Sequence, residues 1–346
     1  GVDIAGERVF EVISQYNAGQ SLIVDDNEKL LLAKLNLQAG SKARRNYAFT
    51  SAMQFLTAGI TILDANLSTV AHQLYFGLKY ALAECYYCVA DFAQSNEQAL
   101  GLFAIATNDL QKANIHRLLA EINTARFEYA QSIQHGLDGL ALLGVALPAR
   151  PDHHYLESLI DDIWSRLGGR KIADLVDLPI MTDATICTAI ELLQTIYGSS
   201  MMIDRNLFFS SGAKIVQLSI EHGNCDGSVV GYSQFGSFLP RLFGKYKEAS
   251  EFDLLAKALV SARGLNSYAA RLEFNSSITG FWTDNLAVST ERMQSAAEMA
   301  LRHGDSAFAA FACGHVLVDF VISGMPLAAV HQQSVNFVEF YSQRNL

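Results

Sequence analysis

Residues 222–249 read HGNCDGSVVGYSQFGSFLPRLFGKYKEA, and this stretch contains both kinds of turn from which the predicted fold follows. It opens with His222-Gly223, the predicted end of one helix, and it closes with Gly244–Ala249, a turn of the second kind. A glycine such as Gly223 supplies the left-handed backbone that closes a helix, and the preceding cation complements the helix dipole. The same ending recurs at Arg263-Gly264 and His303-Gly304, so Gly223, Gly264 and Gly304 follow one another at intervals of 41 and 40 residues. This period predicts stacked helix pairs rather than one closed core.

The turn inside each pair has its own signature. Gly244–Ala249 matches the glycine-x-aromatic-x-x-alanine turn that joins the two helices of a TPR unit. Residues 323–327 take the equivalent position 80 residues later, and residues 283–285 lie midway. The C-terminal half is therefore predicted to be a regular array of TPR-like pairs.

The N-terminal half carries weaker versions of the same turn. Its aromatic positions, Tyr47, Phe92 and Phe127, are 45 and 35 residues apart. Residues 82–87 also show the TPR order of a large apolar residue, a small residue and an aromatic pair, in which the small residue lets the paired helix approach closely. We therefore expect a second array here.

Apolar residues at helical spacing define the expected elements. We predict helices over residues 7–23, 27–44, 48–63, 68–89, 93–106, 109–124, 128–143, 153–167, 184–202, 206–222, 227–243, 247–263, 267–282, 286–302, 306–322 and 327–343. The predicted fold class is an all-α, TPR-like α-α superhelix (solenoid) of about seven helix pairs with a central non-periodic insert. The predicted organisation is a linker or cap helix at 1–24, an array at 25–143, an insert or hinge at 144–183 and a second array at 184–346.

Composition excludes several classes of protein. The net charge is −10, which lacks the basic footprint of a nucleic-acid binder. Five scattered cysteines suit a reducing compartment, and we expect a cytoplasmic location. No uncharged apolar run reaches the roughly 18 to 20 residues that span a bilayer, so no membrane span is expected.

The chain resembles the TPR-like helical region of bacterial multidomain signalling proteins. These join a Ser/Thr kinase-like domain and a STAND-type ATPase to GAF and sensor histidine kinase domains. The segments that carry the resemblance are 7–17, 35–43, 142–148, 174–183 and 215–224. One departure is Ile180, which stands where the family usually has an acidic residue. The resemblance implies a sensing or relay segment, and it implies no catalytic residue here, since the family's catalytic residues belong to the flanking domains.

Three patterns could carry chemistry, and each is better explained by structure. Gly168-Gly169-Arg170-Lys171 lacks the spacing and the hydroxyl of a phosphate-binding loop, so it is interpreted as a break after a helix. Cys85 and Cys88 have no second ligand pair at zinc-site spacing and are expected to pack in the core. His153-His154 with Glu157 offers two metal ligands on one helical turn, but an exposed helix start explains them. We therefore expect neither a cofactor nor enzymatic activity in this chain.

The first helices of TPR pairs line the concave face, so their side chains are candidates for contact with a partner. The candidate interaction residues are Tyr86, Phe235, Arg263, Phe274, Trp282, His303 and Phe311. The basic residues His222, Arg263 and His303 could form a row for an acidic partner, or simply cap their helices. The function that we expect is a non-enzymatic protein-interaction relay, with flanking ATPase or kinase domains or a regulatory protein as the partner. The alternative is a sensor domain that binds a small molecule.

Overall fold

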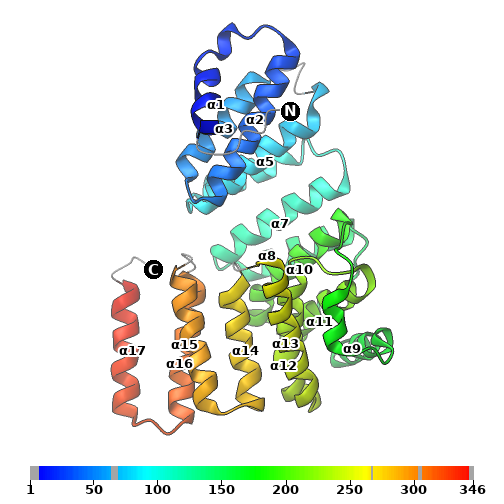
Figure 1. Ribbon diagram of the computed structural model, residues 1–346, viewed down its shortest axis with the longest axis vertical. Helices are drawn as coiled ribbons and strands as arrows, with labels where there is room; N and C mark the ends of the chain where they lie inside the picture. Colours follow the sequence, from blue (N-terminus) through cyan, green and yellow to red (C-terminus); the bar gives the residue numbers. More distant parts are fainter. Residues whose placement is uncertain (1–7, 64–68, 266–267, 303–305, 343–346) are drawn as a thin grey trace. The chain divides into compact units, whose positions relative to one another are not determined.

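The computed structural model describes residues 8–63, 69–265, 268–302 and 306–342, and it is almost entirely helical (Figure 1). The chain divides into two compact units, Gly1–Val145 and Ala146–Leu346. Within each unit, consecutive helices pack on their neighbours. The predicted all-α fold of stacked helices is confirmed.

The first unit consists of paired helices whose first members also contact one another. Its elements are α1 (Arg8–Ala18), η1 (Gln20–Leu22), α2 (Asp26–Arg45), α3 (Phe49–Ile62), α5 (His72–Cys88), α6 (Phe92–Leu102), α7 (Asp109–Ala125) and α8 (Tyr129–Leu142). The pairs are α2 with α3, α5 with α6 and α7 with α8, and α5 packs on both α2 and α7. Buried Ser95 of α6 donates to the Ala83 carbonyl of α5 at 2.9 Å. Small residues thus allow the close approach that the sequence predicts.

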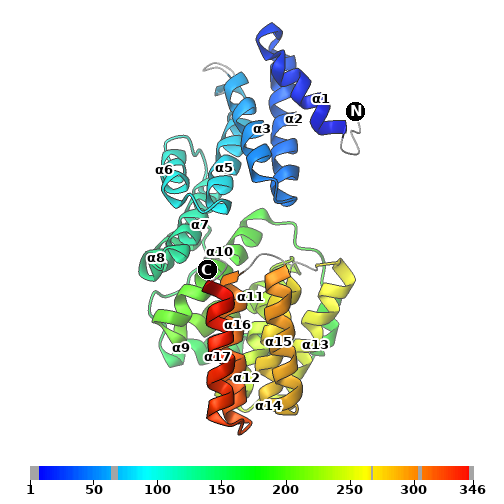
Figure 2. The same cartoon turned by 90° about the vertical axis from the view of Figure 1, so that its left-hand side faces the viewer.

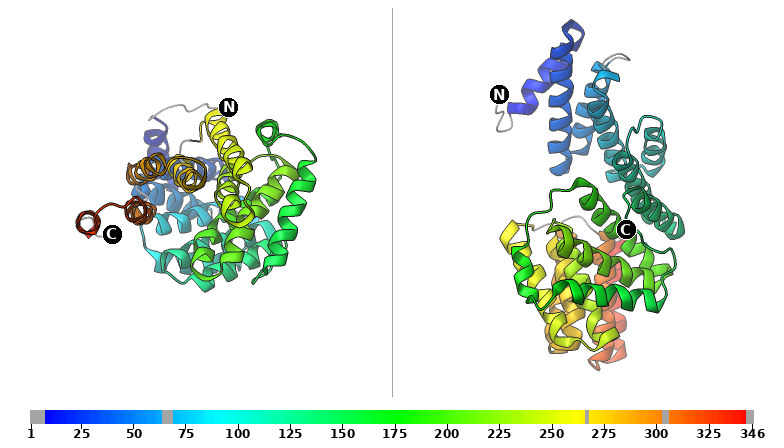
Figure 3. Two further views of the ribbon diagram at one scale, coloured as in Figure 1. Left: turned by 90° about the horizontal axis from the view of Figure 1, so that it is seen from below. Right: turned by 90° about the vertical axis from the view of Figure 1, so that its right-hand side faces the viewer.

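The second unit continues the pairing. Its elements are α9 (His153–Leu167), η2 (Ile172–Asp177), α10 (Ala184–Ile203), α11 (Arg205–His222), α12 (Ser228–Phe243), α13 (Tyr246–Arg263), α14 (Ala269–Thr283), α15 (Leu286–Arg302), α16 (Ser306–Ile322) and α17 (Leu327–Ser342). Helices α14 to α17 each pack on the next, and in Figure 1 α15 and α16 lie between α14 and α17. Figure 2 shows these helices from the side of α17, and the left view of Figure 3 looks along α15 to α17 almost end-on. The main core surrounds α12, which packs on α11, α13 and α14. α9 packs on α11 and η2 on α13, so both belong to this unit.

The turns of the first unit correct the predicted alignment of its repeats. At the turns inside its three pairs, the residues with left-handed backbone are Tyr47, Ala90 and Phe127, with φ of 60°, 59° and 61°, and none of these is glycine. Each is followed by an N–H that bonds to a carbonyl five residues earlier, at 2.9, 3.0 and 2.8 Å, as in a Schellman helix ending. Tyr47 and Phe127 therefore take the place of Gly244, not of Tyr246. The residues equivalent to Tyr246 are Phe49, Phe92 and Tyr129.

The glycine endings of the second unit are mostly as expected. Gly244 and Gly264 have left-handed backbone with φ of 64° and 67°. Gly223 differs, because its φ of 99° is combined with an extended ψ of −177°. Its neighbour Asn224 forms a bridge with Ile180, which takes the chain away from the usual helix ending. Gly304 lies outside the described residues.

Helix α10 has the length and mean hydropathy of a membrane span, the one such helix in the described ranges. Its 18-residue window has a mean hydropathy of 1.2, and 44% of the window is buried within the protein. The core helix of a water-soluble protein has the same properties, so length and composition alone are weak evidence.

Changing Ala90 to glycine is expected to stabilise the first unit by about 0.5–1 kcal/mol. A residue with a Cβ loses about 1–2 kcal/mol in left-handed backbone, and glycine returns part of this gain through its greater freedom when unfolded. Ala90 is exposed, so no packing is lost. Urea unfolding followed by circular dichroism measures the change. Exposed Glu97→Gly in the middle of α6 should instead destabilise by about 1 kcal/mol, and a loss of stability in Ala90→Gly would contradict the argument.

Candidate interaction surface

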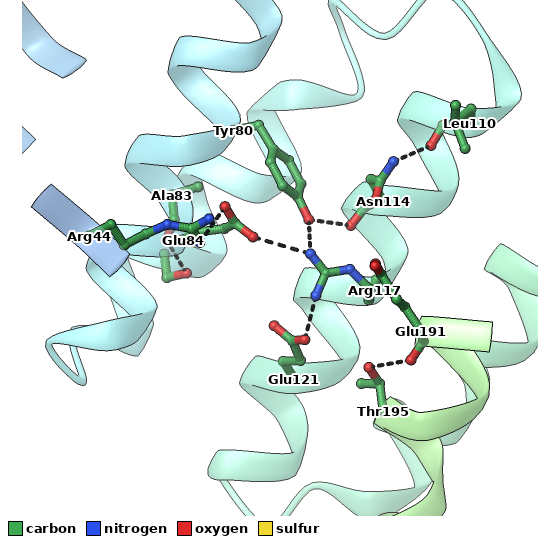
Figure 4. A network of polar contacts seen from close by, with 11 residues as sticks. Arg44, Tyr80, Ala83, Glu84, Leu110, Asn114, Arg117, Glu121, Glu191 and Thr195 are labelled. Carbon is green, nitrogen blue, oxygen red and sulfur yellow. Dashed lines mark hydrogen bonds and ion pairs between the residues drawn. The ribbon is translucent and has the colours of Figure 1, made fainter. Parts of the chain in front are cut away.

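A network of charged side chains joins the first helices of the three pairs in the first unit (Figure 4). Arg44 of α2 pairs with Glu84 of α5 at 2.6 Å, and Arg117 of α7 pairs with the same carboxylate at 3.1 Å. Arg117 also pairs with Glu121 at 2.6 Å and donates to the Tyr80 hydroxyl at 2.9 Å. Tyr80 and Glu84, like Arg117 and Glu121, are four residues apart and so lie on one face of their helices.

The network has a sheltered centre and a more accessible edge. The side chains of Glu84 and Arg117 are 13% and 16% exposed, whereas those of Glu121 and Arg44 are 25% and 31% exposed. Bonds between ionised partners are short and strong, and partial burial protects them from salt. The network therefore fixes the spacing of α2, α5 and α7 and presents charged groups at its edge.

An open apolar depression of about 530 Å³ lies on two of the same helices. It is lined by Leu30, Leu31, Lys34, Leu37, Ala71, Gln73 and Leu74. Leu37 precedes Arg44 by seven residues, and Gln73 precedes Tyr80 by seven. Two helical turns separate each pair, so the depression and the network share one face. We call this face, which combines an apolar half with a charged half, the first-helix face.

The structure scatters the candidate residues of the second unit. Phe235 is fully buried between Phe238 and Phe252, and Phe274 is also a core residue, so neither can contact a partner as predicted. Phe311 is half-buried, and its ring packs against that of Phe274 at 5.2 Å. Trp282 is 41% exposed beside Phe281 near the end of α14.

The remaining candidates are Tyr86 and the basic residues of the possible row, which stays a prediction. Tyr86 is half-buried on α5. Arg263 is used inside the unit, where it donates to the Asn224 carbonyl at 3.0 Å. His222 lies 3.9 Å from Glu221, and His303 falls outside the described residues.

Buried Asn224 takes part in several hydrogen bonds, and the sequence reasoning did not predict this role. Its bonds are Asn224 N to Pro179 O (2.8 Å), Met181 N to Asn224 O (2.9 Å), Asn224 Nδ2 to Leu175 O (2.7 Å), Tyr232 Oη to Asn224 Oδ1 (2.9 Å) and Arg263 Nη1 to Asn224 O (3.0 Å). Two of the segments that carry the family resemblance, 174–183 and 215–224, are thereby joined. These bonds hold residues 175–181 beside Asn224 and tie Asn224 to Tyr232 of α12 and Arg263 of α13.

Two of the three patterns interpreted as structural keep that interpretation. The third is corrected in part, because Cys85 is buried as expected but Cys88, the last residue of α5, is exposed. Gly168 and Gly169 have φ of 58° and 81° directly after α9, as a helix break requires. Burial raises the pKa of the Cys85 thiol to about 11, which disfavours the thiolate that binds metals. His153 and Glu157 share a helical turn at 3.4 Å, on an exposed surface.

One cluster was missed by the sequence reasoning. His116 of α7 and His135 of α8 approach to 3.1 Å between their Nδ1 atoms, and Asp138 lies next to them. Burial lowers the pKa of both histidines. His135 lowers the pKa of His116 further, and the Asp138 carboxylate partly opposes the shift in both. The signal in the sequence was the spacing of His135 and Asp138, three residues apart on a predicted helix.

His315 should make the second unit less stable in acid. It is half-buried against Phe274 and Phe311, and burial lowers its pKa below the ordinary value of 6.5. As the pH falls through that value, the unfolded chain binds the proton and the folded chain does not, so the free energy of unfolding decreases. Above it, His315 contributes no slope.

The measurement is urea unfolding between pH 7.5 and 5. Both tryptophans, Trp164 and Trp282, lie in the second unit and report it by fluorescence. His315→Gln should flatten the dependence on pH, whereas exposed His331→Gln should keep it. Asp319, one turn along α16, is present in all three proteins, so it cancels in the comparison. Equal slopes in wild type and His315→Gln would refute the prediction.

Comparison with known proteins shows a distant similarity between the chain and a signal-transduction protein. No family model matches it. It is 19% identical, over an alignment of 373 residues, to the hybrid signal transduction histidine kinase G of Dictyostelium discoideum. The alignment covers 97% of this chain and 11% of that protein, so the chain spans about a tenth of the relative's length. This distant similarity supports a role related to signalling.

Proposed function

We propose that the chain is a TPR-like interaction segment of a signal-transduction protein, and that its first-helix face binds a protein segment. The observation that carries the proposal is the juxtaposition of the apolar depression with the charged network on one face of α2 and α5. Apolar anchors provide affinity and complementary charges provide specificity in protein recognition. The similarity over nearly the whole chain to a region of a signalling kinase supports the same role.

The bound segment is proposed to be amphipathic, with an apolar anchor for the depression and charged groups for the edge of the network. Leu31 is the most accessible apolar contact, because it is 58% exposed. Arg44 and Glu121 offer one charge of each sign at the edge. The partner is proposed to be a flanking ATPase or kinase domain or a separate regulator, in a STAND-type or histidine kinase system.

In this proposal the chain carries no reaction itself and passes on the state of its partner. A small-molecule sensor remains the alternative, and it requires an enclosed cavity with converging polar groups. A second depression, of about 590 Å³, lies between α9 and the residues around the end of α12. This depression and that of the first-helix face are both open to solvent, which favours a protein segment.

The test is a charge placed in the depression. A photo-crosslinking residue at position 34, introduced into the natural full-length protein, identifies the bound segment, and titration calorimetry then measures its affinity. Leu31→Glu should weaken binding at least tenfold, because the carboxylate would be desolvated against apolar side chains. It should also change signalling output, measured as phosphoryl transfer in the natural protein.

Leu254→Glu is the matched control, since Leu254 is 64% exposed on α13, a second helix of its pair. It should leave affinity and output unchanged. If Leu31→Glu binds the crosslinked segment as tightly as wild type, the first-helix face is not the binding site and the proposal fails.

A further inference from the structure

The α7–α8 hairpin brings together three side chains of the types that bind transition metals. His116 comes from α7, and His135 and Asp138 come from one turn of α8. One potential ligand atom from each lies within 4.8 Å of the other two. We propose that these side chains form a divalent metal site, with Zn²⁺ as the ion that it fits best, and that the ion fastens α7 to α8.

The distances suit zinc. Two Zn–N bonds of about 2.0–2.1 Å at a tetrahedral angle place the nitrogens about 3.3 Å apart. The two Nδ1 atoms are 3.1 Å apart, which needs an adjustment of a few tenths of an ångström. Two imidazoles and one carboxylate are also a ligand set that zinc accepts, whereas Mg²⁺ and Ca²⁺ prefer oxygen alone.

The surroundings hold the ligands in place. Gln134 donates from Nε2 to one carboxylate oxygen of Asp138 at 2.8 Å, an outer contact of the kind that orients metal ligands. The ring of Phe103 packs edge-on against His116 at 5.2 Å between centroids. The short turn through Phe127 fixes α7 against α8, so most of the geometry exists before an ion arrives.

The site is accessible and incomplete. All three residues are only partly buried, so an ion can enter from solvent. Three protein ligands leave a fourth tetrahedral position for water or for a group from another molecule. Without an ion, one histidine donates from Nδ1 to the other, and the pair is merely a hydrogen bond between helices. The experiment separates these two states.

The full chain is stripped of metal with a chelator, dialysed and titrated with Zn²⁺ by calorimetry and with Co²⁺ by visible absorption. We expect one ion per chain and the intense visible bands of tetrahedral Co²⁺. His116→Gln, His135→Gln and Asp138→Asn should each weaken Zn²⁺ binding at least tenfold. His153→Gln, which alters another pairing of a histidine with a carboxylate, should bind like wild type.

Stability gives an independent readout. Zn²⁺ should raise the unfolding temperature of wild type and His153→Gln, because an ion that binds only the folded state stabilises it. The rise should disappear in Asp138→Asn, which keeps the shape of the side chain and is expected to fold even if a histidine variant does not. Absence of Zn²⁺ binding in wild type would overturn the proposal. So would an affinity for Zn²⁺ that is unchanged in both Asp138→Asn and a histidine variant that folds, and only the hydrogen bond would then be left.

Discussion

Gly223→Ala is expected to lower the free energy of unfolding of the second unit by about 3–5 kcal/mol. A Cβ at this position would lie 2.3 Å from the carbonyl oxygen of Pro179, and its φ of 99° is strained for any other residue. The obstructing atom belongs to the backbone, so no side-chain rotation can relieve the clash. Relief requires that residues 179–181 leave their place beside Asn224.

Urea unfolding followed by the fluorescence of Trp164 and Trp282 measures this loss. Gly264→Ala is the matched control, because its φ of 67° is similarly left-handed but no atom lies within 4 Å of the added Cβ. It should cost only about 1–2 kcal/mol, the backbone contribution alone. Equal losses in the two variants would show that the contact with Pro179 does not decide the effect.

Asn224→Ala should cost about 2–5 kcal/mol through a different mechanism. The substitution leaves the Leu175 carbonyl and the Tyr232 hydroxyl without their partner in a buried site. A buried polar group that loses its partner is penalised by its full desolvation. Urea unfolding again provides the measurement.

A second readout shows where the damage lies. Release of residues 175–181 should speed cleavage by trypsin after Arg170 and Lys171, which immediately precede η2. Asn336→Ala, an exposed change on α17, should alter stability by less than about 0.5 kcal/mol and leave the cleavage rate unchanged. Unchanged proteolysis in Asn224→Ala would mean that this residue does not hold the segment.

The sequence predicts the helices well because each has a capping residue or a turn at its ends. Most expected ends lie within two residues of the observed ones. The exceptions are the end of α1, the start of α5 and the end of α6. Side chains of Asp91 and Asn108 cap α6 and α7, as their residue types suggest. Local chemistry thus fixes the elements.

The candidate site was predicted less well, because periodicity does not say which face of a helix is covered. Phe235 was chosen because it lies on a first helix, yet α12 is surrounded by neighbours. Residues 228–240 contain no charge, and a helix without a polar face is normally buried. From the absence of charge in this stretch, Phe235 could have been predicted to lie in the core.

Long-range contacts account for the rest. The role of Asn224 depends on Leu175 and Pro179, more than forty residues earlier, which no local pattern connects to it. His116 and His135 meet only because the α7–α8 turn brings their helices together. The domain limits proposed from the sequence stay a prediction, although the two compact units divide at Val145.

The non-glycine turns at Tyr47, Ala90 and Phe127 also bear on how such repeats diverge. The same backbone ending is reached with glycine at Gly144 and Gly264 and without it at Tyr47, Ala90 and Phe127. A repeat can therefore replace the glycine of its turn at a cost in folding stability of about 1 kcal/mol, which packing against neighbouring repeats can offset. The hydrogen bond that closes each helix therefore identifies equivalent positions in these repeats where the residue that makes the turn does not.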